Sequence, residues 1–139
     1  MSSSCSTPWI DAQPLNWSRE GYRKLVQSIK ATTATDTLPT SKDDTIIPTG
    51  FDILLNCDCI FEPLYGKSWE LLVEVIDECL KLNPKCIVLT SVERRSGDGV
   101  DLFVNKLRDA YYCTFVSSVE LISVDEGRNL ELYLARGFI

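Results

Sequence analysis

Polar and aromatic side chains that could do chemistry cluster directly after one apolar run of the sequence. Behind the run 51–55 come Asn56, Asp58, Phe61 and Glu62. A nearly continuous apolar run of this kind is typical of a parallel strand that is covered on both faces. Ligands of open α/β sheets bind outside the carboxyl ends of such strands. The sequence therefore predicts a binding or catalytic site here, although the two acids could equally end the strand and begin a turn.

Charge and hydropathy limit the classes of function. The 139 residues hold 14 basic and 20 acidic side chains, which gives a net charge of -6 at pH 7. Proteins bind nucleic-acid backbones through clustered Lys and Arg side chains. Because this chain is acidic, we expect no nucleic-acid partner. No apolar window is as long as a membrane span, and residues 1–8 lack the pattern of a signal peptide. We therefore expect no membrane contact and a cytoplasmic location, with the nucleus as a second location.

Six cysteines and the absence of histidine narrow the chemistry further. Most of the cysteines stand in apolar runs, where free Cys behaves as a small buried hydrophobe, so we expect them to be reduced. Cys57 and Cys59 have one residue between them, whereas the Cys pairs of structural zinc sites have two to four. We therefore expect no metal. Without His, the usual Ser–His and Cys–His nucleophile systems are also excluded.

Periodicity predicts an alternation of strands and helices that would position the strand tip. Helices are expected at 19–31, 69–82 and 102–110, and strands at 51–55, 86–92, 111–122 and 129–138. The alternation favours parallel pairing with right-handed crossovers, whereas the short turn 125–128 requires the last two strands to be antiparallel. Residues 7–15 could form a weak edge strand or an irregular entry. The sequence therefore predicts an α/β sheet that begins parallel and closes with a C-terminal hairpin.

Two further segments have a predicted role. Residues 32–50 are rich in Thr, Ser, Asp and Pro, which indicates a mobile loop insertion within a single domain spanning 1–139. At the tip of the second strand, Glu93, Arg94 and Arg95 could contact an acidic substrate surface. A solvated cluster of ion pairs is the favoured account of these three charges.

The order of elements resembles that of the class I S-adenosylmethionine-dependent methyltransferases, whose parallel sheet also closes with an antiparallel hairpin. Residues 51–63, FDILLNCDCIFEP, resemble the strand-four motif of the protein-lysine methyltransferase family that includes the calmodulin and valosin-containing-protein methyltransferases. In that motif an apolar strand is followed by Ala-Asp and, three residues after the Asp, by a tyrosine. The segment 15–17, Leu-Asn-Trp, resembles the family's Leu-Asp-Trp. The resemblance covers most of the chain from about Trp9 onward.

The resemblance implies a partial Rossmann-like fold, S-adenosylmethionine as cofactor and N-methylation of a protein lysine. Trp17 would lie against the adenine, and Cys57 and Asp58 would line the cofactor pocket. Asp58 would also lie near the acceptor lysine, with Phe61 standing where many members have tyrosine. These two residues are the implied catalytic pair, and the implied partner is a protein substrate.

Two parts of the family pattern are missing from the sequence. The glycine-rich turn that holds the cofactor's amino-acid moiety and the acid that holds its ribose should precede residue 15, where only a short segment stands. We therefore expect an incomplete domain, a fragment that need not be active by itself. The alternative is a non-catalytic α/β interaction module derived from a methyltransferase. In both cases the strand at 51–55 would have an unpaired apolar edge, through which another chain could pair.

Overall fold

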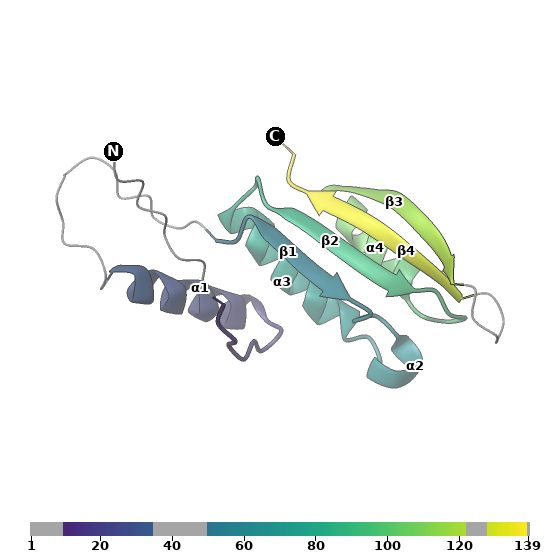
Figure 1. Ribbon diagram of the computed structural model, residues 1–139, viewed down its shortest axis with the longest axis horizontal. Helices are drawn as coiled ribbons and strands as arrows, with labels where there is room; N and C mark the ends of the chain where they lie inside the picture. Colours follow the sequence, from purple (N-terminus) through teal and green to yellow (C-terminus); the bar gives the residue numbers. More distant parts are fainter. Residues whose placement is uncertain (1–9, 35–49, 122–127, 139) are drawn as a thin grey trace.

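A four-stranded mixed sheet organises the computed structural model, which describes residues 10–34, 50–121 and 128–138 (Figure 1). In spatial order the strands are β1 (Ile53–Cys57), β2 (Ile87–Glu93), β4 (Arg128–Arg136) and β3 (Tyr112–Leu121). β1 and β2 pair in parallel, whereas β4 is antiparallel to both β2 and β3. The predicted α/β class and the C-terminal hairpin are confirmed. The finer prediction of a Rossmann-like methyltransferase sheet is not confirmed by this arrangement.

The helices are α1 (Arg19–Ala34), α2 (Glu62–Tyr65), α3 (Trp69–Leu82) and α4 (Val100–Arg108). α1, α3 and α4 match the three predicted helices, although α1 extends to Ala34. α3 ends at Leu82 because Pro84 follows two residues later and disfavours a helical conformation at the residue before it. The short α2 was not predicted. Of the segment 7–15, the described part from Ile10 is irregular, and most of the predicted loop insertion at 32–50 lies outside the described residues.

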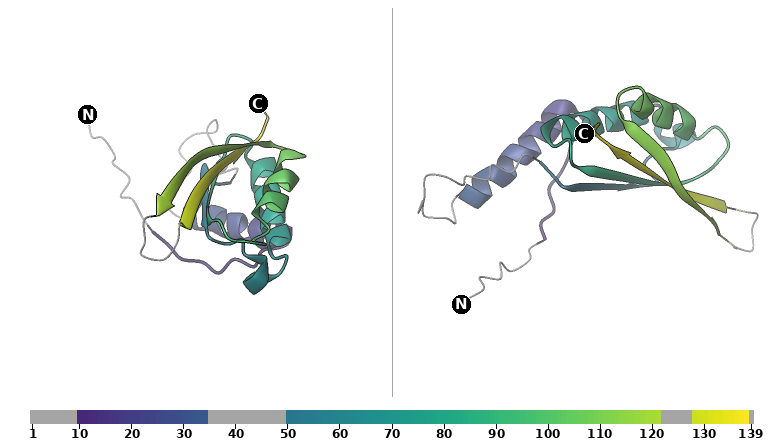
Figure 2. Two further views of the ribbon diagram at one scale, coloured as in Figure 1. Left: turned by 90° about the vertical axis from the view of Figure 1, so that its right-hand side faces the viewer. Right: turned by 90° about the horizontal axis from the view of Figure 1, so that it is seen from above.

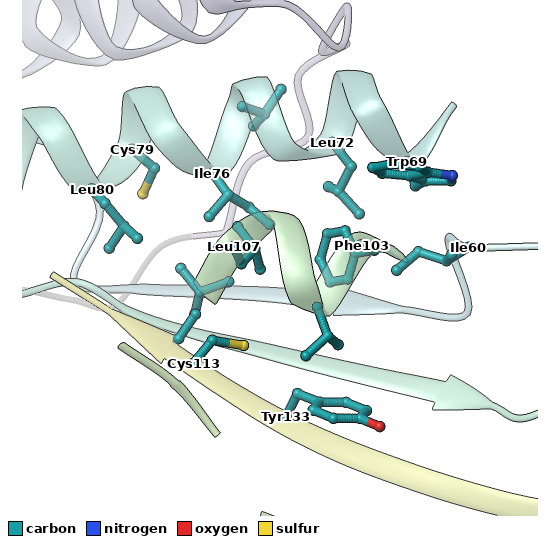
Figure 3. Close-up of a cluster of buried hydrophobic side chains, with 14 of the residues drawn as sticks. Ile60, Trp69, Leu72, Ile76, Cys79, Leu80, Phe103, Leu107, Cys113 and Tyr133 are labelled. Carbon is teal, nitrogen blue, oxygen red and sulfur yellow. The ribbon is translucent and has the colours of Figure 1, made fainter. Parts of the chain in front are cut away.

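The apolar core lies between one face of the sheet and the helices α3 and α4 (Figure 3). Val88, Thr90 and Val92 alternate along β2 and are buried, so this face of the strand is directed toward the helices. From the helices, Ile76 and Phe103 are fully buried against it. The spacing of apolar residues along α3 and α4 thus places one stripe of each helix on the sheet.

The opposite face of the sheet has no helix on it among the described residues (Figure 2). On β1, Ile53 is 58% exposed and Leu55 is 69% exposed, whereas Leu54 between them packs against the core. Leu55 lies beside Leu89 in the register of β1 and β2. The prediction that the strand at 51–55 is covered on both faces is therefore wrong. An apolar run cannot by itself distinguish a strand between two layers from a strand with one bare apolar face.

A polar cluster joins α1 to α3 and so positions the chain that enters α1. Asp77 on α3 accepts hydrogen bonds from Arg19, Lys81 and Tyr111. Burial by itself raises the pKa of Asp77, but the hydrogen bonds from Lys81, Tyr111 and Arg19 outweigh burial and lower this pKa to about 2. Arg23 adds a second ion pair to α3, at 2.5 Å from Glu78.

Substitution of Asp77 by Asn should destabilise the fold in a pH-dependent way. The folded-state pKa of Asp77 is about 2 against an ordinary value of 3.8, so its contribution is present above pH 3.8 and is lost as the pH falls through about 2. We expect Asp77→Asn to lower the free energy of unfolding by about 2 kcal/mol at neutral pH, with the deficit shrinking as the pH falls through this window. Urea denaturation across the pH range measures this, with Asp109→Asn at an exposed position as the control. A deficit that stays constant from neutral pH down to about 2 would contradict the assignment.

Candidate functional site

A groove of about 630 Å³ lies at the carboxyl end of β1. Four parts of the chain line it: the segment before α1, the end of β1 with the turn that follows, the end of α2, and the start of α3. The lining residues are Leu15, Asn16, Trp17, Cys57, Asp58, Cys59, Tyr65, Ser68 and Leu71. The structure thus brings together Trp17, Cys57 and Asp58, the three predicted cofactor-binding residues. Phe61, the second predicted catalytic residue, is not in the lining.

A tight backbone turn at Asp58 forms part of the lining of the groove. Asp58 has a φ of 50°, in the left-handed region, where Asp is one of the few residue types other than Gly that is accommodated. Its N–H donates to the carbonyl of Ser91 at 2.8 Å, which ties the turn to β2. The two flanking cysteines, Cys57 and Cys59, are then both presented to the groove. Trp17, which is partly buried and packs against the core, is also part of the lining.

The carboxylate of Asp58 is paired with Arg95 from the tip of β2. The Arg95 Nη2 lies 3.0 Å from Asp58 Oδ2 and 2.7 Å from Glu93 Oε2. The same guanidinium stands 4.7 Å from the centre of the Phe61 ring, so Phe61 supports Arg95 by a cation–π contact. Arg95 is shared between Asp58 and Glu93, so it offsets the charge of Asp58 only in part. S-adenosylmethionine binding, and the catalytic roles of Asp58 and Phe61, stay predictions that this geometry does not strengthen.

Arg94 is the centre of a second charged cluster, which is structural. Its guanidinium lies 2.9 Å from Asp98, 2.9 Å from Glu131 and 3.1 Å from Asp101. These partners come from β4, α4 and the loop before α4, so one side chain joins three parts of the fold. Asp98 is buried and also accepts hydrogen bonds from two backbone N–H groups of its loop. The predicted ion pairs at this strand tip are thus present, but they are partly buried rather than solvated, with the side chain of Asp98 only 5% exposed.

Two other polar residues of the predicted strand tip have structural partners. Asn56 is buried, and its Nδ2 donates to the Thr90 hydroxyl at 3.0 Å, so this side chain links β1 to β2 inside the core. Glu62 accepts a hydrogen bond from the indole N–H of Trp69 at 2.8 Å, which fixes α2 against α3. The expectation that these side chains belong to a ligand site is therefore wrong for Asn56, and Glu62 is engaged in holding the fold.

The unpaired edge of β1 is the second candidate site. The Asp52 carbonyl accepts from the N–H of Ile87, and the Asp58 N–H donates to Ser91, so the backbone of these residues is directed toward β2. In a parallel ladder such residues alternate, so the N–H and C=O groups of Ile53, Leu55 and Cys57 point away from β2. β1 is the first strand in the sheet order, and no described strand pairs with this side. Sequence reasoning predicted this edge but not the bare apolar face beside it.

No group of three or more His, Cys, Asp or Glu side chains in the described ranges is placed to hold a metal ion. None of the helices found there is both long and apolar enough to cross a membrane.

Comparison with known proteins gives a partial match. Over 53 residues, 38% of this chain, the sequence is 51% identical to secreted RxLR effector protein 48 of Plasmopara viticola. The match makes up 27% of that protein, so the chain spans about a quarter of the relative's length. No protein-family model matches the chain.

This match corrects several predictions. The resemblance to protein-lysine methyltransferases is overturned, because the similar protein is a secreted effector. The predicted function, lysine methylation, is therefore wrong, and the match gives no clear support to the alternative of a non-catalytic module derived from such an enzyme. The predicted cytoplasmic or nuclear location is wrong for the same reason. The misleading signal was a short motif, because an apolar strand followed by an acid in a turn is a local pattern that is not specific to one family.

Cys57 should be the most reactive of the five cysteines that the structure describes. Its side chain is exposed, Cys59 is partly buried, and Cys79, Cys86 and Cys113 are buried. Burial also raises the pKa of Cys59, which lowers its thiolate fraction. We expect iodoacetamide to alkylate Cys57 roughly tenfold faster than the other four, as measured by peptide mass spectrometry. Cys57→Ser should abolish the fast phase and Cys59→Ser should keep it; equal rates at Cys57 and the buried thiols would disprove the exposure of the groove.

Proposed function

We propose that this chain is the protein-binding part of a secreted effector and acts by binding a host protein. The proposal is supported by the 51% identity to a protein named as a secreted effector. Since the match covers about a quarter of that relative, the activity of the relative as a whole is not transferred to this chain. The surface that carries the proposal is the edge of β1 together with the bare face of the sheet.

Strand addition is the binding mode that suits this surface. An extended segment of a partner can pair with the outward backbone groups of Ile53, Leu55 and Cys57, because unpaired N–H and C=O groups at a sheet edge are a template for another strand. Alternate side chains of that segment would then extend the apolar face formed by Ile53, Leu55 and Ile87, which is 40% exposed. A bare apolar surface of this kind typically marks an interaction site.

Charge indicates what should flank the partner's apolar residues. Asp52 and Asp58 stand at the two ends of β1, both are exposed, and the net charge of the chain is -6. Arg95 offsets the charge of Asp58 but also pairs with Glu93, so this end of the strand keeps an acidic excess. Opposite charges favour association and suppress wrong partners. The expected ligand is an extended protein segment with apolar residues at alternate positions and Lys or Arg at its ends.

A positive charge introduced at the edge of β1 should weaken this binding. The probe is a synthetic peptide of alternating Val and Thr with two Lys at each end, and its affinity is measured by fluorescence anisotropy. We expect Leu55→Lys to weaken binding at least tenfold, roughly 1.4 kcal/mol, because it places a buried charge in the interface and repels the flanking Lys.

Leu102→Lys on α4 is the matched control, since Leu102 is 54% exposed and lies on the helical side of the sheet. It should bind as the unaltered chain does. A peptide flanked by Glu should bind more weakly than the Lys-flanked peptide. Equal affinity of Leu55→Lys and the unaltered chain, or no binding of the Lys-flanked peptide, would contradict strand addition at β1.

A further inference from the structure

Two buried thiols are in contact at the end of the sheet opposite the groove. Cys79 lies on the last part of α3 and Cys86 directly before β2, with both side chains fully buried. Their sulfur atoms are 3.5 Å apart. Figure 3 shows the sulfur of Cys79 directed from α3 into the core. Among the described cysteines, this is the pair whose sulfur atoms are in contact.

The turn between the two cysteines holds them in this arrangement. The N–H of Asn83 donates to the carbonyl of Cys79, and the N–H of Cys86 donates to the carbonyl of Asn83, each at 2.9 Å. The side chain of Asn83 donates in addition to the Phe51 carbonyl at 3.0 Å. Pro84 in the middle of the turn restricts its backbone further. Both cysteines are therefore presented by a well-defined turn.

We propose that Cys79 and Cys86 form a disulfide bond in the secreted protein. The inference rests on the proposed function in one respect, since secretion supplies an oxidising compartment in which disulfides form and persist. A disulfide has its sulfur atoms about 2.05 Å apart, so each sulfur needs to move by less than about 1 Å from its present position. The expectation that these two cysteines are reduced would then apply only to the protein before its oxidation.

The oxidant is a disulfide, either glutathione disulfide or a disulfide-donating oxidoreductase. One cysteine thiolate attacks a sulfur of the oxidant, which forms a mixed disulfide and releases one thiolate leaving group. The second cysteine thiolate then attacks the protein sulfur of that mixed disulfide and releases the other. The two protein thiols lose two protons and two electrons, and the oxidant is reduced to two thiols.

Burial fixes the stage at which the bond forms. Burial, together with the neighbouring Cys79, raises the pKa of the Cys86 thiol to about 12, and an oxidant has no access to it in the folded core. The thiolate is the attacking species, so exchange in the folded protein is slow. Oxidation therefore takes place during folding, before α3 closes over the sheet. Once formed, the bond fixes the end of α3 to the start of β2.

Oxidative refolding of the full chain tests the proposal. The chain is unfolded, refolded in a mixture of oxidised and reduced glutathione, alkylated and digested with trypsin without reduction. Lys81 and Lys85 separate the two cysteines, so a crosslink joins the tryptic peptides 68–81 and 86–94. We expect this linked pair in most molecules and a Tm about 5 °C above that of the protein refolded with reductant.

Two variants control the experiment. Cys86→Ala should lose both the linked peptides and the effect of reductant on the Tm, whereas Cys113→Ala, at a buried cysteine outside the pair, should keep both. Alkylation of Cys79 and Cys86 in the soluble refolded chain, or a crosslink of either to another cysteine, would overturn the proposal. The peptide affinity of the β1 edge is a separate readout. If the crosslink forms but the peptide does not bind, the disulfide stands and the proposed function is contradicted. If the peptide binds but no crosslink forms, only the disulfide is contradicted.

Discussion

Packing of α3 and α4 against a single face of the sheet is the constraint on which the other features of this chain depend. Each helix has one apolar stripe, and both stripes are used on the face that presents Val88 and Val92. No described element remains to cover the other face, although β1 and β2 are apolar there as well. Burial of apolar area is the main driving force of folding, so an apolar face that the chain does not cover itself is a surface suited to a partner.

Ion pairs and hydrogen bonds then position the segments at the two ends of the helical layer. Asp77 binds α1 to α3, and Arg94 binds the loop before α4 to the hairpin. The first cluster positions Trp17 beside the turn after β1, and Arg95, next to Arg94, holds Asp58. The groove and the edge of β1 therefore lie next to each other, and both result from the packing of the helices on one face of the sheet. Charged residues near them have structural partners, which is why their presence at a strand tip did not identify a catalytic centre.

Local patterns in the sequence were sufficient for much of the fold. Helical spacing predicted α1, α3 and α4 to within a few residues at most boundaries, and the short turn after β3 correctly required an antiparallel hairpin. Trp17, Cys57 and Asp58 line one groove, as expected, but that expectation came from the resemblance to methyltransferases and not from the spacing of these residues. Features that depend on contacts between distant parts of the chain could not be predicted from the sequence. An apolar run such as that of β1 is expected both for a strand buried on one face and for a strand buried on two faces. Asn56 could be assigned to the interior only from its hydrogen bond to Thr90, a residue of the neighbouring strand.

The family was misjudged for a related reason. The motif around β1 describes a strand and the turn that ends it, which are local properties, whereas membership of a family depends on the chain as a whole. Phe61 illustrates the difference: its position after Asp58 suggested a reacting aromatic residue, but its ring lies under the guanidinium of Arg95. The similarity to a secreted effector favours protein binding at the surface of β1 over catalysis at its carboxyl end.

Amide-resolved hydrogen exchange with the Lys-flanked peptide tests the central claim most directly, since it reports which backbone groups become paired. Strand addition at β1 predicts that the amides of Ile53, Leu55 and Cys57 become protected when peptide binds, while those along the outer edge of β3 do not change. Protection confined to the β3 edge or to residues 15–17 of the groove, with the amides of β1 exchanging as before, would contradict the account.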